Sequence, residues 1–218
     1  MRVLDLFSGI GGFAYAGHLL GGFTTLDFVE IDPYCQKILR KNFPNVPIHD
    51  DITTFDTSFR FGEYDLITAG FPCQDLSSAG KQAGLGAGTR SGLFYRVMQI
   101  ARQVRPKFIL LENVANTISH NKGQTFQQIL HEIAQSGYNA EWGIVSAADV
   151  GACHLRKRIW IIAYANDPRY YRTSKCQADS KWTETIAERY KSQPQPTRQT
   201  YLTANTTSVR VEGHRGQG

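Results

Sequence analysis

The sequence predicts an α/β protein built on one doubly wound, mostly parallel sheet of seven strands. Up to about residue 165, short apolar runs alternate with longer amphipathic segments, a pattern typical of parallel strands joined by covering helices. The chain has 218 residues, of which 41% are hydrophobic and 20% charged, so it can bury one sizeable core. We therefore expect residues 1–165 to form one folded domain.

The individual elements follow from the apolar runs and from the positions of proline. Pro33 suits the first turn of a helix, whereas Pro44 and Pro106 end the helices that precede them. Strands are expected at 2–7, 24–30, 46–48, 64–69, 107–112, 140–146 and 158–164, and helices at 11–20, 33–42, 91–104 and 123–136.

The composition changes after residue 165. The net charge is +5, but residues 1–165 carry 15 Lys and Arg against 14 Asp and Glu, so most of the excess lies in the remaining segment. That segment, 166–218, is polar and contains few aliphatic residues, so it cannot offset its ordering entropy by burial. We expect a basic, poorly ordered tail, whose charge suits a polyanionic partner or solubility alone.

The cysteines and the N-terminus indicate the cellular compartment. Four scattered cysteines without a Cys-x-x-Cys pair argue against structural zinc and against a disulfide framework. No apolar run approaches the ~20 residues that a membrane span needs. The acidic Asp5 stands where a signal peptide would be apolar. The sequence therefore predicts a cytoplasmic protein without a membrane partner.

A potential nucleophile and a potential acid follow two neighbouring strands. Cys73 lies in the loop Gly70–Ser77 directly after an apolar run, and the next apolar run ends in Glu112-Asn113-Val114. Both positions would meet at the carboxyl edge of the sheet, where open α/β sheets bind ligands. A thiolate beside an acid suits attack on an electron-poor ring, although a buried packing cysteine and a solvated rim carboxylate are the alternatives. We expect Asn113 to orient the cysteine loop through backbone hydrogen bonds.

A glycine-rich turn follows the first strand, in the segment DLFSGIGGF at 5–13. Its glycines let the backbone approach a cofactor, and Glu30 ends the second strand about 20 residues later, where an acid bonds ribose hydroxyls. The full dinucleotide fingerprint is incomplete, so S-adenosylmethionine, a nucleoside cofactor without phosphates, fits as well or better. Asp50 and Asp51 follow the short third strand, where an acid could accept from an adenine amino group. The alternatives are a tight glycine turn without a ligand and, for the adjacent acids, a solvated turn.

Two further segments have both a functional and a structural interpretation. The glycine-rich stretch 80–88 is either a lid over a substrate or a flexible surface loop. Arg156 and Arg158 alternate with other residues at the start of a strand, so we expect both on one face of it. That face is either a functional site or a basic edge that prevents aggregation.

Taken together and in this order, these motifs resemble the C5-cytosine DNA methyltransferases. The resemblance covers residues 1 to about 165 and rests on DLFSGIGGF (5–13), VEID (29–32), DDI (50–52), GFPCQDLS (70–77), ENV (112–114) and RKR (156–158). It implies the Rossmann-like fold of S-adenosylmethionine-dependent methyltransferases, with residues 1–165 as the catalytic and cofactor-binding domain. It also implies a prokaryotic or phage-encoded enzyme of the restriction–modification type.

The resemblance also implies a role for each motif position. Cys73 would attack C6 of a cytosine flipped out of double-stranded DNA, Glu112 would hold and protonate N3, and Arg158 would contact O2. Arg156 would support the cysteine site. The S-adenosylmethionine pocket would consist of Phe7, Gly9, Gly11, Glu30, Ile31, Asp51, Ile52, Pro72 and Leu93.

The sequence departs from the family pattern at two places. His154 stands where the family usually has glutamine, and 166–218 contains neither a complete target-recognition region nor the closing asparagine motif. We therefore expect 166–218 to be the truncated start of that region, with a second chain as one source of the rest. Two alternatives follow: a relative that methylates cytosine in tRNA, and an inactive or split-enzyme subunit that binds cofactor or DNA. Phe71 before Pro72 favours the DNA enzymes.

Overall fold

The computed structural model describes residues 1–72 and 92–166. Cys73, the glycine-rich stretch 80–88 and tail residues 167–218 therefore lie outside the described residues. What the sequence predicts for those segments stays a prediction.

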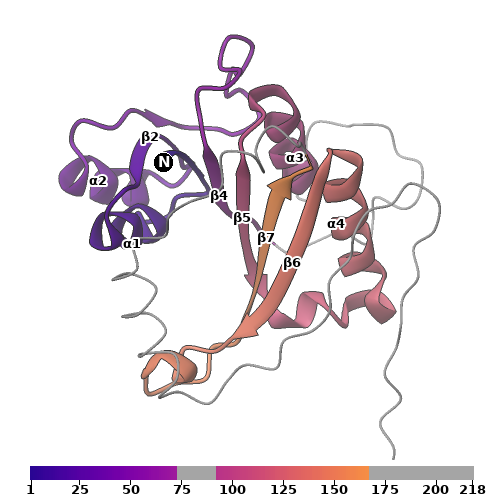
Figure 1. The fold of residues 1–218 in the computed structure, drawn as a ribbon. Helices are drawn as coiled ribbons and strands as arrows, with labels where there is room; N and C mark the ends of the chain where they lie inside the picture. Colours follow the sequence, from indigo (N-terminus) through magenta and orange to yellow (C-terminus); the bar gives the residue numbers. More distant parts are fainter. Residues whose placement is uncertain (73–91, 167–218) are drawn as a thin grey trace, which may run out of the picture.

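The fold is a seven-stranded sheet in the order β3-β2-β1-β4-β5-β7-β6 (Figure 1). Among these described strands, β7 runs antiparallel to both β5 and β6, and the other four pairings are parallel, which confirms the predicted mostly parallel sheet. The chain reverses direction across the sheet after β3, so the carboxyl ends of β1 and β4 form the switch point where such sheets bind ligands. The strands are β1 (Arg2–Leu6), β2 (Thr24–Val29), β3 (Ile48–His49), β4 (Leu66–Gly70), β5 (Phe108–Val114), β6 (Tyr138–Val145) and β7 (Arg158–Ala165).

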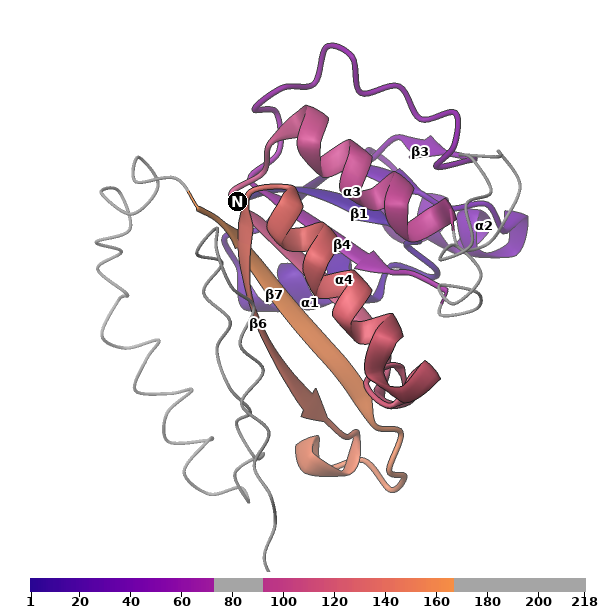
Figure 2. The same ribbon diagram turned by 90° about the vertical axis from the view of Figure 1, so that its right-hand side faces the viewer.

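Helices cover both faces of the sheet, as the alternating pattern predicts. Figure 2 shows α3 and α4 in front of the strands and α1 behind them. The helix beginning at Pro33 has Asp32 as its N-cap, whose Oδ1 accepts from the Tyr34 backbone N–H at 2.7 Å. The helices are α1 (Gly12–Leu20), α2 (Pro33–Asn42), α3 (Gly92–Val104) and α4 (Gln124–Gln135).

The main core lies between the sheet and helices α3 and α4. The helix α3 buries one apolar stripe, and Ile67, Ile109 and Leu111 of the central strands are fully buried beneath it. Burying such a side chain contributes roughly 1.5–3 kcal/mol relative to exposure, so these strands form the most strongly held part of the sheet. Their carboxyl ends are consequently a rigid base for side chains that project from the edge.

The expectation that Arg156 and Arg158 share one face of a strand is wrong. The strand β7 begins at Arg158, which pairs with Val114 of β5 and Val145 of β6, the last residues of both partner strands. Residues before Arg158 therefore have no strand to pair with. Arg156 lies in the preceding turn, exposed and with a left-handed φ of 33°.

The helices of the described ranges are all too short or too polar to cross a membrane.

Asp5 is a buried carboxyl group at the centre of the sheet. Its Oδ1 accepts from Thr68 Oγ1 at 2.6 Å, which ties β1 to β4, whereas Oδ2 has no partner within the described part of the chain. Burial raises the pKa of Asp5 to about 7, against the lowering effect of the Thr68 hydrogen bond, and the charge of Glu30 raises it further.

This carboxyl group should make the fold less stable as the pH rises toward neutrality. Asp5 has a pKa of 3.8 unperturbed and about 7 in the fold, so between these values the native state binds more protons than the unfolded chain. Its contribution is fully present below pH 3.8 and is lost by about pH 7. We expect the free energy of unfolding of Asp5→Asn to rise relative to that of the parent protein, by at most about 1.4 kcal/mol per pH unit across that range. Urea unfolding of both proteins from pH 4 to pH 8 measures this difference, and parallel pH curves would contradict it.

Candidate active site at the carboxyl edge of the sheet

The ends of β4 and β5 lie in direct contact. Gly70 pairs with Glu112 in the parallel register, and a Cβ added to Gly70 would lie 3.3 Å from Glu112 Oε2 and 4.0 Å from the Phe13 ring. The missing side chain therefore lets the carboxylate rest against the last residue of β4. Three residues further along the chain is Cys73, outside the described residues.

Glu112 forms an ion pair with Arg158 across the β5–β7 pairing. Arg158 Nε lies 2.7 Å from Glu112 Oε1, and both side chains are 25% exposed. The carboxylate thus lies at the rim of the sheet, where one oxygen is held by a guanidinium and the other faces Gly70. The Trp160 ring, on the strand position opposite Glu112, contacts Phe13 of α1 edge-on at 6.0 Å between centroids.

Asn113 fixes the chain that leads to the cysteine loop, which confirms the prediction made for it. Its side chain is buried; Nδ2 donates to the Phe71 carbonyl at 3.0 Å and Oδ1 accepts from the Val114 N–H at 2.8 Å. The backbone two residues before Cys73 is therefore tied to β5 by a fully used amide.

The glycine-rich turn after β1 is held by Glu30. Glu30 Oε2 accepts from the Gly9 N–H at 2.7 Å, and Oε1 accepts from the Asp32 N–H at 2.8 Å. The turn has left-handed backbone at Phe7, Gly9 and Gly11. Gly11 is needed for space as well, because a Cβ there would lie 2.7 Å from the Phe43 ring.

This turn fits a nucleoside. Each oxygen of the Glu30 carboxylate has accepted one backbone N–H and retains a lone pair, so the pair can accept two vicinal hydroxyl groups. A Cβ position at Gly9 has open space around it, and the neighbouring Ile31 side chain is 71% exposed, which offers an apolar surface for a flat ring.

The other predicted pocket residues lie after β1, β3 and β4 and at the start of α3. Buried Gln36 joins the ends of β2 and β3, since its Nε2 donates to the Glu30 carbonyl at 2.7 Å and to Asp50 Oδ1 at 3.1 Å. Asp51 Oδ1 accepts from the Thr53 N–H at 2.8 Å in the turn that follows. Ile52 is buried, whereas Phe7, Pro72 and Leu93 are half-buried.

Comparison with known proteins decides the family. The sequence profile described as C-5 cytosine-specific DNA methylase matches residues 1–214. The chain belongs to this family.

Relatives of this chain are named type II methyltransferases. The chain is 37% identical over 163 residues to M1.ScrFI of Lactococcus lactis subsp. cremoris, covering 75% of this chain and 41% of that protein. It is 34% identical over 167 residues to M.HhaI of Haemophilus parahaemolyticus, covering 77% and 50%. The chain therefore spans about half the length of the curated relatives it matches.

Solved structures of methyltransferases share the fold of this chain. The S. pombe Dnmt2 methyltransferase has a TM-score of 0.59 at 27% identity, with 77% of this chain and 50% of that chain covered. A putative DNA modification methyltransferase encoded within a prophage of E. coli has a TM-score of 0.59 at 25% identity, covering 76% and 47%.

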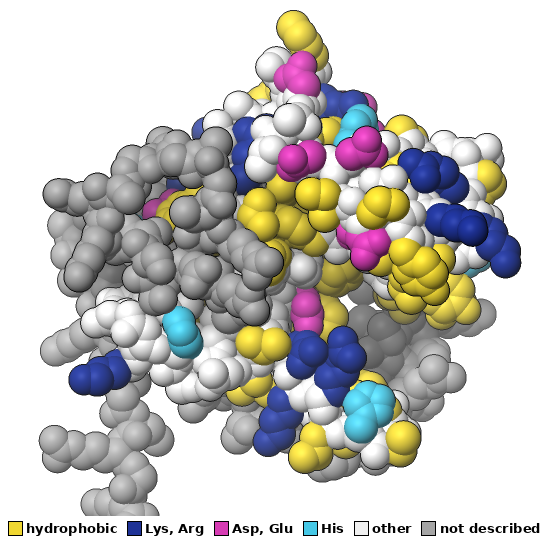
Figure 3. Space-filling model, turned by 180° about the vertical axis from the view of Figure 1, so that it is seen from behind, with side chains coloured by type: hydrophobic (Ala, Val, Ile, Leu, Met, Phe, Trp, Pro, Cys, Tyr) yellow, Lys and Arg dark blue, Asp and Glu magenta, His cyan; other side chains and the backbone are white. Residues whose placement is uncertain are grey.

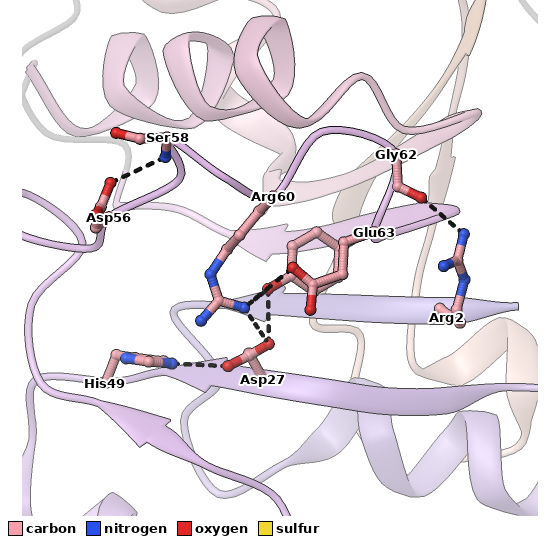
Figure 4. A network of polar contacts seen from close by, with 9 residues as sticks. Arg2, Asp27, His49, Asp56, Ser58, Arg60, Gly62 and Glu63 are labelled. Atoms are coloured by element: carbon pink, nitrogen blue, oxygen red, sulfur yellow. Dashed lines mark hydrogen bonds and ion pairs between the residues drawn. The ribbon is translucent and has the colours of Figure 1, made fainter.

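One polar network of the fold could not be predicted from the sequence. Asp27 of β2 accepts from Tyr64 Oη at 2.6 Å, pairs with Arg60 Nη1 at 3.0 Å and contacts His49 Nε2 at 2.7 Å (Figure 4). These residues are up to 37 positions apart, so no local pattern announces the contact. The network fastens the segment 50–64, which contains Asp51, onto the edge of the sheet.

The connection between β6 and β7 presents positive charge beside the acid. His154, Arg156 and Lys157 are exposed there, directly before Arg158 and its ion pair with Glu112. Figure 3 shows Lys and Arg side chains gathered with a histidine on this lower part of the molecule, next to an acidic side chain.

Removing the Asn113 amide should loosen the end of β4. Asn113→Ala leaves the Phe71 carbonyl without its donor, and a buried unsatisfied polar group costs about 1–3 kcal/mol. We expect a loss of that size in the free energy of unfolding, measured with urea. Asn116→Ala, at an exposed position on the same segment, is the control. Equal stability of the two variants would contradict the role of Asn113.

Proposed function

We propose that this chain transfers a methyl group from S-adenosylmethionine to C5 of cytosine in DNA through a covalent bond between Cys73 and C6. The observation that carries the proposal is the Glu112–Arg158 ion pair, 2.7 Å long, against the end of the strand that leads to Cys73. An acid held at that rim beside a nucleophile suits chemistry on a cytosine ring. We also propose that it acts in the cytoplasm.

The domain boundaries belong to this proposal. We infer that residues 1–165 are the catalytic and cofactor-binding domain, because they include the whole sheet and both proposed half-sites. Residues 166–218 are then a basic region that belongs with target recognition. Residues outside 1–165, or a second chain, would then read the DNA sequence to be methylated.

The proposed cofactor site lies at the carboxyl ends of β1, β2 and β3. S-adenosylmethionine supplies an electrophilic methyl group on a sulfonium. Glu30 would bind the ribose hydroxyls, Ile31 and Ile52 would pack on the adenine, and Asp51 would accept from its amino group. Phe7, Gly9 and Gly11 would bring the backbone of the turn close to the methionine part, with Pro72 and Leu93 on the opposite side.

The proposed chemistry begins with the cysteine because cytosine C5 is a poor nucleophile while the ring is aromatic. The Cys73 thiolate would form a bond to C6. Glu112 would hold N3 and protonate it as negative charge enters the ring. Arg158 would contact O2, and Arg156 would favour the thiolate from its exposed turn. C5 would then take the methyl group from the sulfonium, which would leave as the thioether S-adenosylhomocysteine. Water would take the C5 proton, and elimination of the Cys73 thiolate would restore the aromatic ring.

The target base must leave the duplex to reach this edge. Extruding one nucleotide costs a few kcal/mol, which contacts to the DNA backbone must offset. The exposed cations of residues 154–158 flank the proposed base site and are placed to contribute such contacts.

Methyl transfer by the full chain tests the proposal. With S-adenosylmethionine labelled in the methyl group and mixed-sequence duplex DNA, we expect label in 5-methylcytosine. Cys73→Ser should abolish it, and Glu112→Gln should lower the rate by about 10²- to 10⁴-fold, the usual value of a positioned acid. The exposed Cys153, changed to serine, is the matched control and should keep full activity.

Three results would contradict this proposal. Label that persists in Cys73→Ser would exclude the covalent route. Label in a tRNA pool but not in DNA would favour the RNA alternative, and cofactor binding without any transfer would leave this chain as a binding component only.

Cofactor binding should depend on Glu30. In Glu30→Gln the amide NH₂ would face a backbone N–H that now donates to a carboxylate oxygen, and one acceptor for the ribose would be lost. We expect affinity for S-adenosylhomocysteine, measured by titration calorimetry, to fall by at least about tenfold. Glu141→Gln on β6 is the control, and an unchanged affinity in Glu30→Gln would contradict the assignment.

A further inference from the structure

We propose that Arg96 is a positioning residue for the cofactor site, because its guanidinium ties the Asp51 turn to helix α3 at one turn from Leu93. The inference rests on the proposed function, in which Asp51 and Leu93 contact the cofactor. Neither the predicted site residues nor the motifs of the sequence include Arg96.

The Arg96 side chain uses three nitrogens on three acceptors. Nε donates to the Ile52 carbonyl at 3.0 Å, Nη2 donates to the Phe55 carbonyl at 2.7 Å, and Nη1 donates to Gln99 Oε1 at 2.8 Å. The first two acceptors belong to the irregular segment directly after Asp51, and the third lies on α3 itself. The planar guanidinium can span both carbonyls at once, which a lysine ammonium cannot do with the same fixed geometry.

These two carbonyls are the ones that decide where the Asp51 turn lies. The side chains of Ile52 and Phe55 are buried in the core, at 4% and 3% exposure, so the turn is anchored from inside by packing and from α3 by Arg96. Asp51 precedes Ile52, and its own hydrogen bond from the Thr53 N–H only shapes the turn locally. Without Arg96, the Asp51 turn loses its hydrogen bonds to α3.

The opposite end of the same segment is held independently. The Arg60 guanidinium lies over the Phe55 ring at 5.2 Å from its centroid and pairs with Asp27 of β2. Removing Arg96 would therefore free the Asp51 end while the Phe55 end stays attached to the sheet. The expected effect is a local shift of Asp51 relative to Leu93 rather than a loss of the fold.

Such a shift should weaken recognition of adenine more than the chemistry. Asp51 is proposed to accept from the adenine amino group, and hydrogen bonds depend steeply on distance and angle. Glu112 and Arg158 belong to β5 and β7, whereas the hydrogen bonds of Arg96 in the described structure go to Ile52, Phe55 and Gln99. A shift of Asp51 should therefore lower the affinity for the cofactor and the selectivity for adenine.

The test compares Arg96→Met with Arg102→Met in the full chain. Arg102 lies on the same helix and pairs with Glu132 at 2.9 Å, so its replacement removes a similar side chain and one ion pair elsewhere on α3. Binding of S-adenosylhomocysteine and of S-inosylhomocysteine, which lacks the 6-amino group, is measured by calorimetry. KM for S-adenosylmethionine and kcat are measured with saturating DNA.

We expect Arg96→Met to bind the adenosyl ligand about tenfold more weakly and to lose most of its preference over the inosyl ligand. KM should rise by a similar factor with kcat within about twofold, whereas Arg102→Met should match the parent in all four values. If the parent protein prefers the adenosyl ligand, unchanged affinity and unchanged preference in Arg96→Met would overturn the inference. A parent that binds neither ligand, or both equally, would instead overturn the proposed cofactor site on which the inference rests.

Discussion

The parallel pairing of β4 with β5 places Gly70 against the carboxylate of Glu112, and the rest of the proposed site depends on this contact. A side chain at Gly70 would press on Glu112 Oε2, while Arg158 holds the other oxygen, Oε1. Asn113 then fixes the following backbone by its bond to the Phe71 carbonyl. One register therefore sets the acid, its cation and the start of the cysteine loop.

The second half of the site is attached to the same strands through β1. Asp5 and Thr68 join β1 to β4 inside the sheet, and the glycine turn that follows β1 is held by Glu30 at the end of β2. The proposed cofactor and base sites thus lie on adjacent strands of one rigid layer, and Phe13 of α1 contacts Trp160 of β7. Such fixed geometry suits transfer between two bound molecules, because the relative position of the reacting atoms is largely set in advance.

Local patterns predicted much of this arrangement. The strand ends carrying Glu30 and Glu112 and the glycines of the turn could be located because apolar runs and turn residues mark them directly. The role of Asn113 followed from its place beside Glu112. Arg156 was misplaced because the start of β7 is set by where β5 and β6 end, which the sequence of β7 does not contain.

Contacts between distant segments could not be predicted in this way. Arg96 reaches carbonyl groups more than 40 residues earlier in the chain, and nothing in a helical pattern marks an arginine that bonds backbone rather than solvent. The bonds from Arg60 and Tyr64 to Asp27 are of the same kind. Arg96 does stand out in the sequence as a cation within the apolar first turns of α3, three residues after Leu93. That position alone does not say which groups it bonds.

A crystal structure of the chain with S-adenosylhomocysteine tests the central claim most directly, namely that the carboxyl edge around β1 and β4 is the cofactor site. The account predicts ribose hydroxyls within hydrogen-bond distance of both Glu30 oxygens, the adenine amino group on Asp51, and the thioether sulfur on the side of Gly70 and Glu112. A ligand bound elsewhere, or bound at this edge with Glu30 still contacting only Gly9 and Asp32, would contradict it.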